Sequence, residues 1–268
     1  MKIITFTQEQ LNSLGINVRA YYDYQDERVR LDGRLGQKKS GETKKKAPPR
    51  DPVLLMYLQS RRDEIYKFEE GLEKEITWMV RDHPLWKLFL TNVKGCGPVM
   101  AAVIISQFDI HKATMVSNLV SFAGLAPGKD RKVKGKKRSY NQFLKNKLCG
   151  VLSSSFLKCK SVPYSGYYYQ YKIRLENSDR KVEERLRAAD RAKKKYKGQT
   201  TRVVKWKDAY PGHRHDASIR KMIKEFLKDL YVSWREIEGL PVREPYAEEY
   251  LGKVHGGSQK NNGERKAA

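Results

Sequence analysis

The clearest hydrophobic pattern in the chain runs from residue 51 to residue 83. An aspartate followed by a proline is a typical helix start, and the helix must end before the proline of His83-Pro84. Apolar residues recur between these limits at the seven-residue spacing of a coiled-coil seam. The seam residues are Leu58, Ile65, Leu72 and Met79. The pattern predicts a long coiled-coil helix that forms a homodimer through this seam or, with equal weight, packs as a core helix.

Residues 84–160 are predicted to form a helix-hairpin-helix core. An apolar segment leads into Gly95-Cys96-Gly97, and Pro98 opens a second helix rich in Ala, Val and Ile. The glycines permit positive φ angles, and the start of the second helix offers free backbone N–H groups to a phosphate. Lys94, Gly95 and Gly97 are therefore candidate ligands of RNA or DNA. A tight turn inside a helical core is the alternative.

A strongly basic stretch follows this hairpin. Residues 128–148 contain nine Lys and Arg against one Asp, which predicts a cationic loop that leads into an amphipathic helix. The helix is expected to bury Phe143, Leu144, Leu148, Val151, Leu152 and Phe156. The candidate RNA- or DNA-binding residues of the stretch are Lys129, Arg131, Lys132, Lys134, Lys136, Lys137, Arg138, Lys145 and Lys147.

Residues 161–211 are predicted to form a tyrosine-rich segment and a basic helical arm. Five tyrosines occur between Tyr164 and Tyr171, where they could stack on unpaired bases or, as we prefer, pack on a neighbouring helix. Lys172–Lys207 carries fourteen basic and five acidic residues with few aliphatic ones. A helix with so small an apolar face must protrude or become ordered on a polyanion.

Residues 212–251 contain the last predicted packing helix, from Asp216 to Leu240, with a clean 3.6-residue stripe. His213 and Arg214, just before it, are candidate phosphate contacts in a lead-in loop. Residues 1–50 are predicted to be a small segment with a short hairpin within residues 17–35, formed by Val18, Tyr22, Val29 and Leu31, and a basic linker. The tail, residues 252–268, is expected to be disordered.

The composition of the chain indicates which class of partner it binds. The chain has 268 residues and a net charge of +24, from 55 Lys and Arg against 31 Asp and Glu. The natural partner of such a charge is a polyanion, most commonly nucleic acid. Three cysteines without a paired spacing predict neither a disulfide framework nor a zinc site. We expect no metal, no cofactor and no membrane span, and a reducing interior compartment.

Two motifs resemble a known family. Gly95, Gly97, Pro98, Ala101 and Ala102, followed by Phe122-Ala123-Gly124-Leu125-Ala126-Pro127-Gly128, match the C-terminal region of the IS-one-ten family of transposases. That region is also similar to the Nop domain of box C/D ribonucleoproteins and to the compact Tas proteins of tandem-interspaced-guide-RNA systems. The resemblance implies a mainly α-helical, Nop-domain-like fold and a prokaryotic or viral protein that works in the cytoplasm.

The resemblance also implies a function, with two departures. Transposases of this family carry an N-terminal RuvC-like domain with four metal-binding acids, and a Ser-Gly pair shortly after the GLAP motif. Only about fifty residues precede Asp51, and Lys132-Val133 stands at the place of the pair. The implied function is therefore Tas-like: the protein holds a guide RNA and targets DNA, with a possible recruited nuclease. The alternatives are a divergent or truncated transposase or an unguided structural protein that binds DNA or RNA.

Because both catalytic elements are missing, we expect the isolated protein neither to cut nor to join DNA, with or without Mg²⁺. Labelled DNA incubated with the protein and resolved on a denaturing gel checks this. Strand cleavage that the substitution Ser139→Ala abolishes would contradict the expectation and support the transposase alternative. Cleavage that survives Ser139→Ala would point to a contaminating nuclease or to a different catalytic site.

Overall fold

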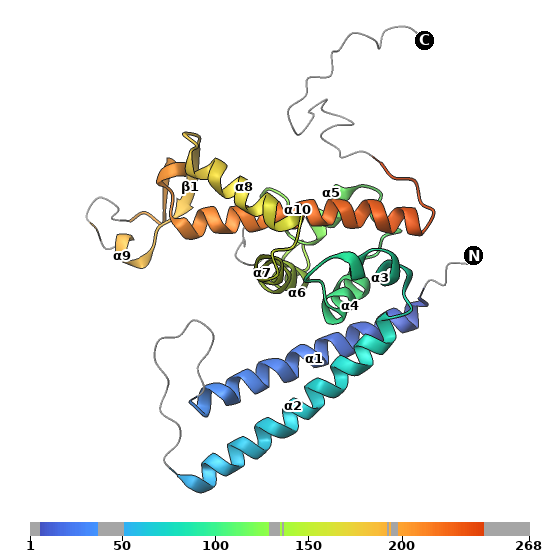
Figure 1. Ribbon diagram of the computed structural model, residues 1–268. Helices are drawn as coiled ribbons and strands as arrows, with labels where there is room; N and C mark the ends of the chain where they lie inside the picture. Colours follow the sequence, from blue (N-terminus) through green and yellow to red (C-terminus); the bar gives the residue numbers. More distant parts are fainter. Residues whose placement is uncertain are drawn as a thin grey trace, which may run out of the picture. The chain divides into compact units, whose positions relative to one another are not determined.

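The chain is mainly α-helical, as predicted. It differs from the prediction mainly in two segments: a predicted short hairpin is part of a long helix, and part of a predicted helical arm is a β-hairpin. The computed structural model describes residues 6–36, 51–128, 135, 137–191, 193 and 198–243. It divides into two compact units, residues 1–109 and residues 110–268, which are described separately below (Figure 1). The basic linker after residue 36 and the predicted disordered tail lie outside the described residues.

The first unit begins with a long helix, α1 (Gln8–Arg34), so the prediction of a short hairpin within residues 17–35 was wrong. Thr7 and Gln10 form a capping box at its start, in which each side chain bonds the other residue's backbone N–H. Leu14, Val18 and Leu31 are buried along one face. Tyrosines and polar groups fill the rest of that face, which hides the helical period in the sequence.

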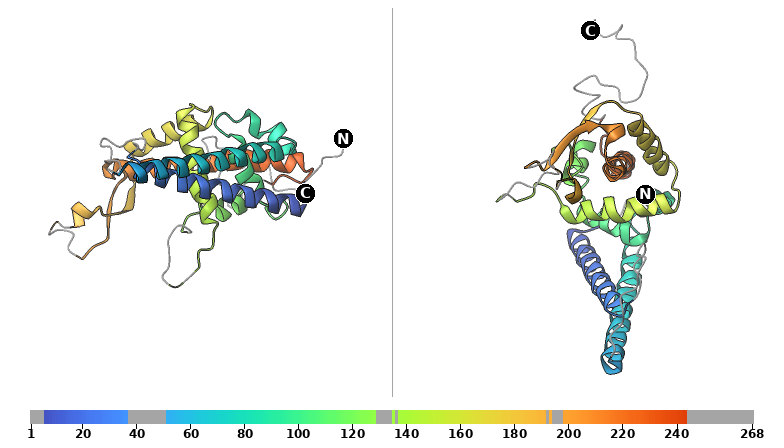
Figure 2. Two further views of the ribbon diagram at one scale, coloured as in Figure 1. Left: turned by 90° about the horizontal axis from the view of Figure 1, so that it is seen from below. Right: turned by 90° about the vertical axis from the view of Figure 1, so that its left-hand side faces the viewer.

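Helix α2 (Pro52–Val80) starts where the sequence predicted, with the Asp51 side chain accepting a hydrogen bond from the N–H of Val53 at 2.9 Å. It pairs with α1 of the same chain as a helical hairpin (Figure 2). Leu58 and Ile65 of the predicted seam are buried against α1 in a cluster with Leu31. Leu72 and Met79, the other two seam residues, are half-buried, and homodimerisation itself stays a prediction.

Polar contacts run alongside this apolar cluster. Glu69 of α2 is buried and accepts hydrogen bonds from Arg28 of α1, with Nε at 2.5 Å from Oε2 and Nη2 at 3.2 Å from Oε1. Arg62 of α2 bonds Asp32 of α1 at 3.1 Å. Removing one partner of a buried pair leaves the other charge uncompensated, so these contacts fix the register of the two helices.

The first helix of the predicted helix-hairpin-helix is short, with only five residues. Helix α3 (Pro84–Leu88) and a 3₁₀ turn (Leu90–Asn92) precede the turn, and α4 (Pro98–Gln107) follows it. Gly95 has a φ of 93° and so needs to be glycine, whereas Gly97 has a φ of −76°. Helix α4 is buried on all sides from Met100 to Ile105 and packs on α1 and α2.

The second unit begins with α5 (Val116–Phe122), α6 (Gln142–Asn146), a π-helical turn (Lys147–Leu152) and α7 (Ser153–Lys158). Leu144, Leu148, Leu152 and Phe156 are buried, which confirms most of the predicted amphipathic face. Val151 was predicted to be buried but is 44% exposed, and Phe143, also predicted to be buried, is half-buried. Val151 lies in the π-helical turn, whose i→i+5 hydrogen bonds depart from the α-helical period that the prediction assumed.

The basic segment is not a helical arm beyond α8 (Tyr164–Glu176), so that part of the fold prediction was wrong. Strands β1 (Lys181–Arg185) and β2 (Thr201–Lys205) pair antiparallel, with the short helix α9 (Ala188–Arg191) in their connection and a 3₁₀ turn (Trp206–Asp208) after them. The long helix α10 (Pro211–Ile237) then packs along α8. Its stripe of Met222, Ile223, Phe226, Leu227, Leu230 and Trp234 is buried as predicted.

Helix α10 begins five residues earlier than predicted, at Pro211, so the segment taken as a lead-in loop forms its first turns. Among the described helices, none is both long and apolar enough to span a lipid bilayer.

We expect Ile65→Ala to lower the free energy of unfolding by about 2–5 kcal/mol, because Ile65 is 1% exposed and its removal leaves a cavity between α1 and α2. Urea unfolding measures the change. Met56→Ala is the matched control on the exposed face of the same helix and should change stability by at most about 0.5 kcal/mol. Equal effects of the two substitutions would contradict the assignment of this seam to internal packing.

A second prediction concerns His83, the cap of α3. Its Nδ1 accepts a hydrogen bond from the N–H of Leu85 at 3.1 Å, and burial lowers its pKa to about 4. An unfolded histidine has a pKa of about 6.5, so the unfolded chain binds the extra proton first. Stability is therefore complete above about pH 6.5 and falls by up to about 3 kcal/mol as the pH drops towards 4.

The variant His83→Asn separates this effect from other titrating groups, because asparagine keeps the capping oxygen and has no charge in this range. Unfolding measured between pH 7 and pH 4 should show a smaller loss of stability in the variant. Parallel pH profiles of wild type and variant would show that His83 is not the group responsible.

Candidate nucleic-acid interface

The excess positive charge of the chain belongs almost entirely to the second unit. Residues 110–268 contain 37 Lys and Arg against 16 Asp and Glu, a net charge of +21. Residues 1–109 contain 18 against 15, a net charge of +3. Charge of one sign concentrated in one unit attracts polyanions to that unit. The second unit is therefore where a nucleic-acid interface is to be sought.

A close backbone contact sets the base of the predicted cationic loop. Gly124, which follows α5, has a φ of 67°, and the ring of Tyr140 lies directly against it. A Cβ atom at this position would be 2.7 Å from Cγ of Tyr140. The N–H of Asn141 also donates to the carbonyl of Phe122 at 2.9 Å. These contacts join residues 122–124 to residues 140–141, on either side of the predicted cationic loop. The positive φ and the close ring explain the first glycine of the GLAPG motif.

Two lysines lie over two aromatic rings next to this contact. Nζ of Lys145 is 4.8 Å from the ring centre of Tyr140, and Nζ of Lys147 is 5.4 Å from that of Phe143. All four side chains are partly exposed. A partly exposed ring beside an ammonium group can stack on a base while the cation contacts the adjacent phosphate.

Helix α10 adds cations that the sequence analysis did not select. Burial, and then the neighbouring charges of Arg220 and Lys221, lower the pKa of Lys224. Burial raises the pKa of the Cys149 thiol, and the charges of Lys145 and Arg220 both oppose that rise. Lys145 and Arg220 are therefore both close to the same thiol. Their sequence signal was weak, because cations on the polar face of an amphipathic helix are usually only solvated.

We use the name basic cluster for six cations of the second unit: Lys137 and Arg138, which are exposed just before Tyr140, Lys145 and Lys147 over the rings, and Arg220 and Lys224 on α10. Four of these six were predicted from the sequence. Five other predicted residues lie outside the described residues: Lys129, Arg131, Lys132, Lys134 and Lys136. Lys94, Gly95 and Gly97 belong to the first unit, and a surface shared by them and the loop stays a prediction.

His213 and Arg214 make internal contacts at the start of α10. The His213 ring stacks on Trp206 with the ring centres 5.0 Å apart. Nη1 of Arg214 donates to the carbonyls of Trp206, Lys207 and Ala209, at 3.3, 3.0 and 2.5 Å. These contacts tie the 3₁₀ turn to α10, so the structure gives both residues a packing role that the sequence did not predict.

Two tyrosines of the tyrosine-rich segment pack against α10, and a third is exposed. The hydroxyl of Tyr164 donates to Asp229 at 3.0 Å, and that of Tyr168 lies 2.6 Å from Nδ1 of His215, so both pack against α10. Tyr169 is 51% exposed. The preference for packing therefore fits the residues that face α10.

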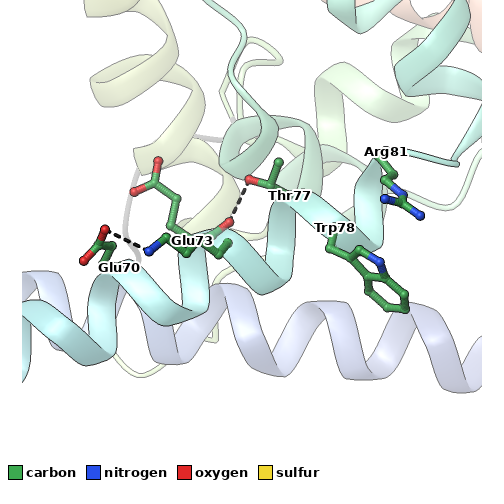
Figure 3. Close-up of a pocket in the computed structure, with 6 residues that line it drawn as sticks. Glu70, Glu73, Thr77, Trp78 and Arg81 are labelled. Carbon is green, nitrogen blue, oxygen red and sulfur yellow. Dashed lines mark hydrogen bonds and ion pairs between the residues drawn. The ribbon is translucent and has the colours of Figure 1, made fainter.

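The first unit has a shallow groove on the surface of α2. It is lined by Glu70, Glu73, Lys74, Thr77, Trp78 and Arg81, and Figure 3 shows the Trp78 ring beside Arg81. Its charges are mixed, which does not favour a polyanion. Among the described residues, no group of three or more His, Cys, Asp or Glu side chains could hold a metal ion.

We expect Gly124→Ala to destabilise the protein more than Gly128→Ala. Both glycines have positive φ angles, 67° and 75°, so each substitution costs about 1–2 kcal/mol of backbone strain. Only Gly124→Ala also drives a methyl group into the Tyr140 ring. Thermal unfolding should therefore show a larger loss for Gly124→Ala, partly restored by adding Tyr140→Ala. Equal losses would show that the ring contact contributes nothing.

In comparisons with protein-family models, with curated proteins and with solved structures, this chain matches none.

Proposed function

We propose that the protein binds a guide RNA through the basic cluster of its second unit and, through that RNA, targets DNA without cutting it itself. The observation that carries the RNA-binding part is the pairing of Lys145 with Tyr140 and of Lys147 with Phe143, within a unit of net charge +21. The guide function rests on the resemblance of the GLAPG segment to RNA-guided families.

The chemistry of the cluster favours RNA with unpaired bases. Rings beside cations bind bases by stacking, and a base must be unstacked from its own helix to reach such a ring. The cations neutralise the flanking phosphates without reading their sequence. Base pairing by the RNA would then supply the sequence specificity that such contacts lack.

Replacing Lys137, Arg138, Lys145 and Lys147 together with Gln should weaken the binding of single-stranded RNA by at least ~10-fold at moderate salt. Each lost phosphate contact lowers the log–log salt slope by ~0.7, so the slope should fall by up to ~2.8. Fluorescence anisotropy across a salt series measures both quantities. The fold should survive, because these side chains lie outside the buried stripes.

The matched control removes four cations from the first unit: Arg61, Lys67, Lys74 and Lys87, each changed to Gln. That unit is nearly neutral, so RNA affinity should change by less than ~2-fold. If both variants lose the same affinity, binding depends on total charge and the basic cluster is not a site.

Guidance itself is tested by sequencing the RNA that copurifies with the protein. A defined structured RNA, present at about one copy per protein and complementary to a DNA target, supports the proposal. A broad sample of cellular RNA without a recurring species would contradict it and favour an unguided binding protein.

A further inference from the structure

The β-hairpin of the second unit presents an exposed outer face that the basic cluster does not include. It projects from the end of α8 and α10 where α8 finishes and α10 begins (Figures 1 and 2). Because side chains alternate along a strand, every second pair points outward. The outward pairs are Lys181 with Lys205, Glu183 with Val203, and Arg185 with Thr201, and all six residues are exposed.

The inner face holds the hairpin in place by polar contacts. Glu184 is only 2% exposed and accepts hydrogen bonds from Nε of Arg202 at 2.7 Å and from the N–H of Tyr210 at 2.8 Å. The Tyr210 ring lies between the guanidinium groups of Arg187 and Arg202, each 4.3 Å from its centre. A two-stranded hairpin is marginal by itself, so this network gives the ribbon a fixed orientation at the start of α10.

The outer face carries three cations, and one of them, Lys205, forms an ion pair with Asp179 at 3.0 Å. Lys181 and Lys205 stand directly opposite each other, and like charges in such a pair are destabilising. Arg185 adds a third cation on the same face, and Val203 is 66% exposed between them. Within the described part of the hairpin, the cations outnumber Glu183 on this face by three to one. An excess of positive charge on an exposed face favours a polyanion as its partner.

We propose that the outer face of this β-hairpin binds the major groove of duplex DNA. Neighbouring strands are about 4.8 Å apart, and the groove of B-form DNA, about 12 Å wide, admits a two-stranded ribbon. The major groove of A-form RNA is too narrow and deep for side chains to read. Lys181, Arg185 and Lys205 contact phosphates, and Val203 provides an apolar contact to base edges such as the thymine methyl group.

This inference rests on the proposed function, because it assumes that the second unit is the nucleic-acid-binding unit. The inference adds a binding site for DNA that is separate from the RNA-binding site. Single-stranded RNA lies on the basic cluster, and a DNA duplex lies on the hairpin.

The test changes Lys181, Arg185 and Lys205 together to Gln in the full chain. Binding is measured by fluorescence anisotropy across a salt series with three probes of equal length: duplex DNA, duplex RNA and single-stranded RNA. We expect duplex DNA to bind at least ~10-fold more weakly and its salt slope to fall by up to ~2.7, at ~0.9 per lost contact. Single-stranded RNA should bind within ~2-fold of wild type.

Two further variants complete the design. Arg61, Lys67 and Lys74 changed together to Gln form the charge-matched control in the first unit and should leave all three affinities within ~2-fold. Val203→Ala removes apolar contact without changing charge, so it should weaken duplex DNA binding and leave the salt slope unchanged. Far-UV circular dichroism and thermal unfolding check that the hairpin variant is folded.

The outcomes separate the two proposals. The groove assignment is overturned if the hairpin variant keeps wild-type affinity for duplex DNA. It is also overturned if the affinities for duplex RNA and single-stranded RNA fall as much as the affinity for duplex DNA. In both cases RNA binding by the second unit stands. If wild type binds none of the probes, the proposed function fails and the inference fails with it.

Discussion

Like-charge repulsion is the constraint against which the second unit must fold. Residues 110–268 have a net charge of +21, and only about 5–15 kcal/mol separate the folded and unfolded states of most domains. The buried stripe of α10 opposes the repulsion. Phe226 is fully buried against Phe156 and Tyr164, with ring centres 5.5 Å away in both contacts. The stripe confines the cations to outer faces, where an anionic partner can reach them.

The charged residues of the first unit are used differently. Its charges nearly cancel, and they are used in pairs such as Arg28 with Glu69 to fix one helix on another. The two units therefore differ in what their charged residues do. In the first, most charges are balanced. In the second, ion pairs such as Arg202 with Glu184 also occur, but a large excess of positive charge is available to a ligand. The proposed function depends on that difference more than on the total charge of +24.

The parts of the fold that could be predicted from the sequence are those with a plain apolar period or a strong terminus signal. The start of α2 at Asp51-Pro52 and the stripe of α10 belong to this group. Helix α1 was missed because Gln25 and Arg28, which bond the buried Glu69, occupy its packed face. The β-hairpin was missed because only one of its two inner pairs, Val182 with Val204, is apolar, and the other is Glu184 with Arg202.

The residues of the basic cluster were likewise predicted only where the sequence carries a local signal. Lys145 and Lys147 were predicted from a charge run beside an apolar stripe, and the structure adds the rings that they cover. Arg220 comes from a helix far along the chain, so only the folded arrangement brings it near Cys149, and Lys224 lies near Arg220 on the same helix. Arg214 was selected for its charge, yet its guanidinium bonds backbone carbonyls, which no sequence pattern indicates.

The central claim is that nucleic acid is held by the second unit and not by the α1–α2 hairpin. Ultraviolet crosslinking of the full chain to single-stranded RNA, followed by mass spectrometry of the crosslinked peptides, tests it most directly. The account predicts that the crosslinks concentrate in residues 137–147, at Tyr140 and Phe143. Crosslinks concentrated along α1 or α2, for example at the exposed Trp78, with none at Tyr140 or Phe143, would contradict it.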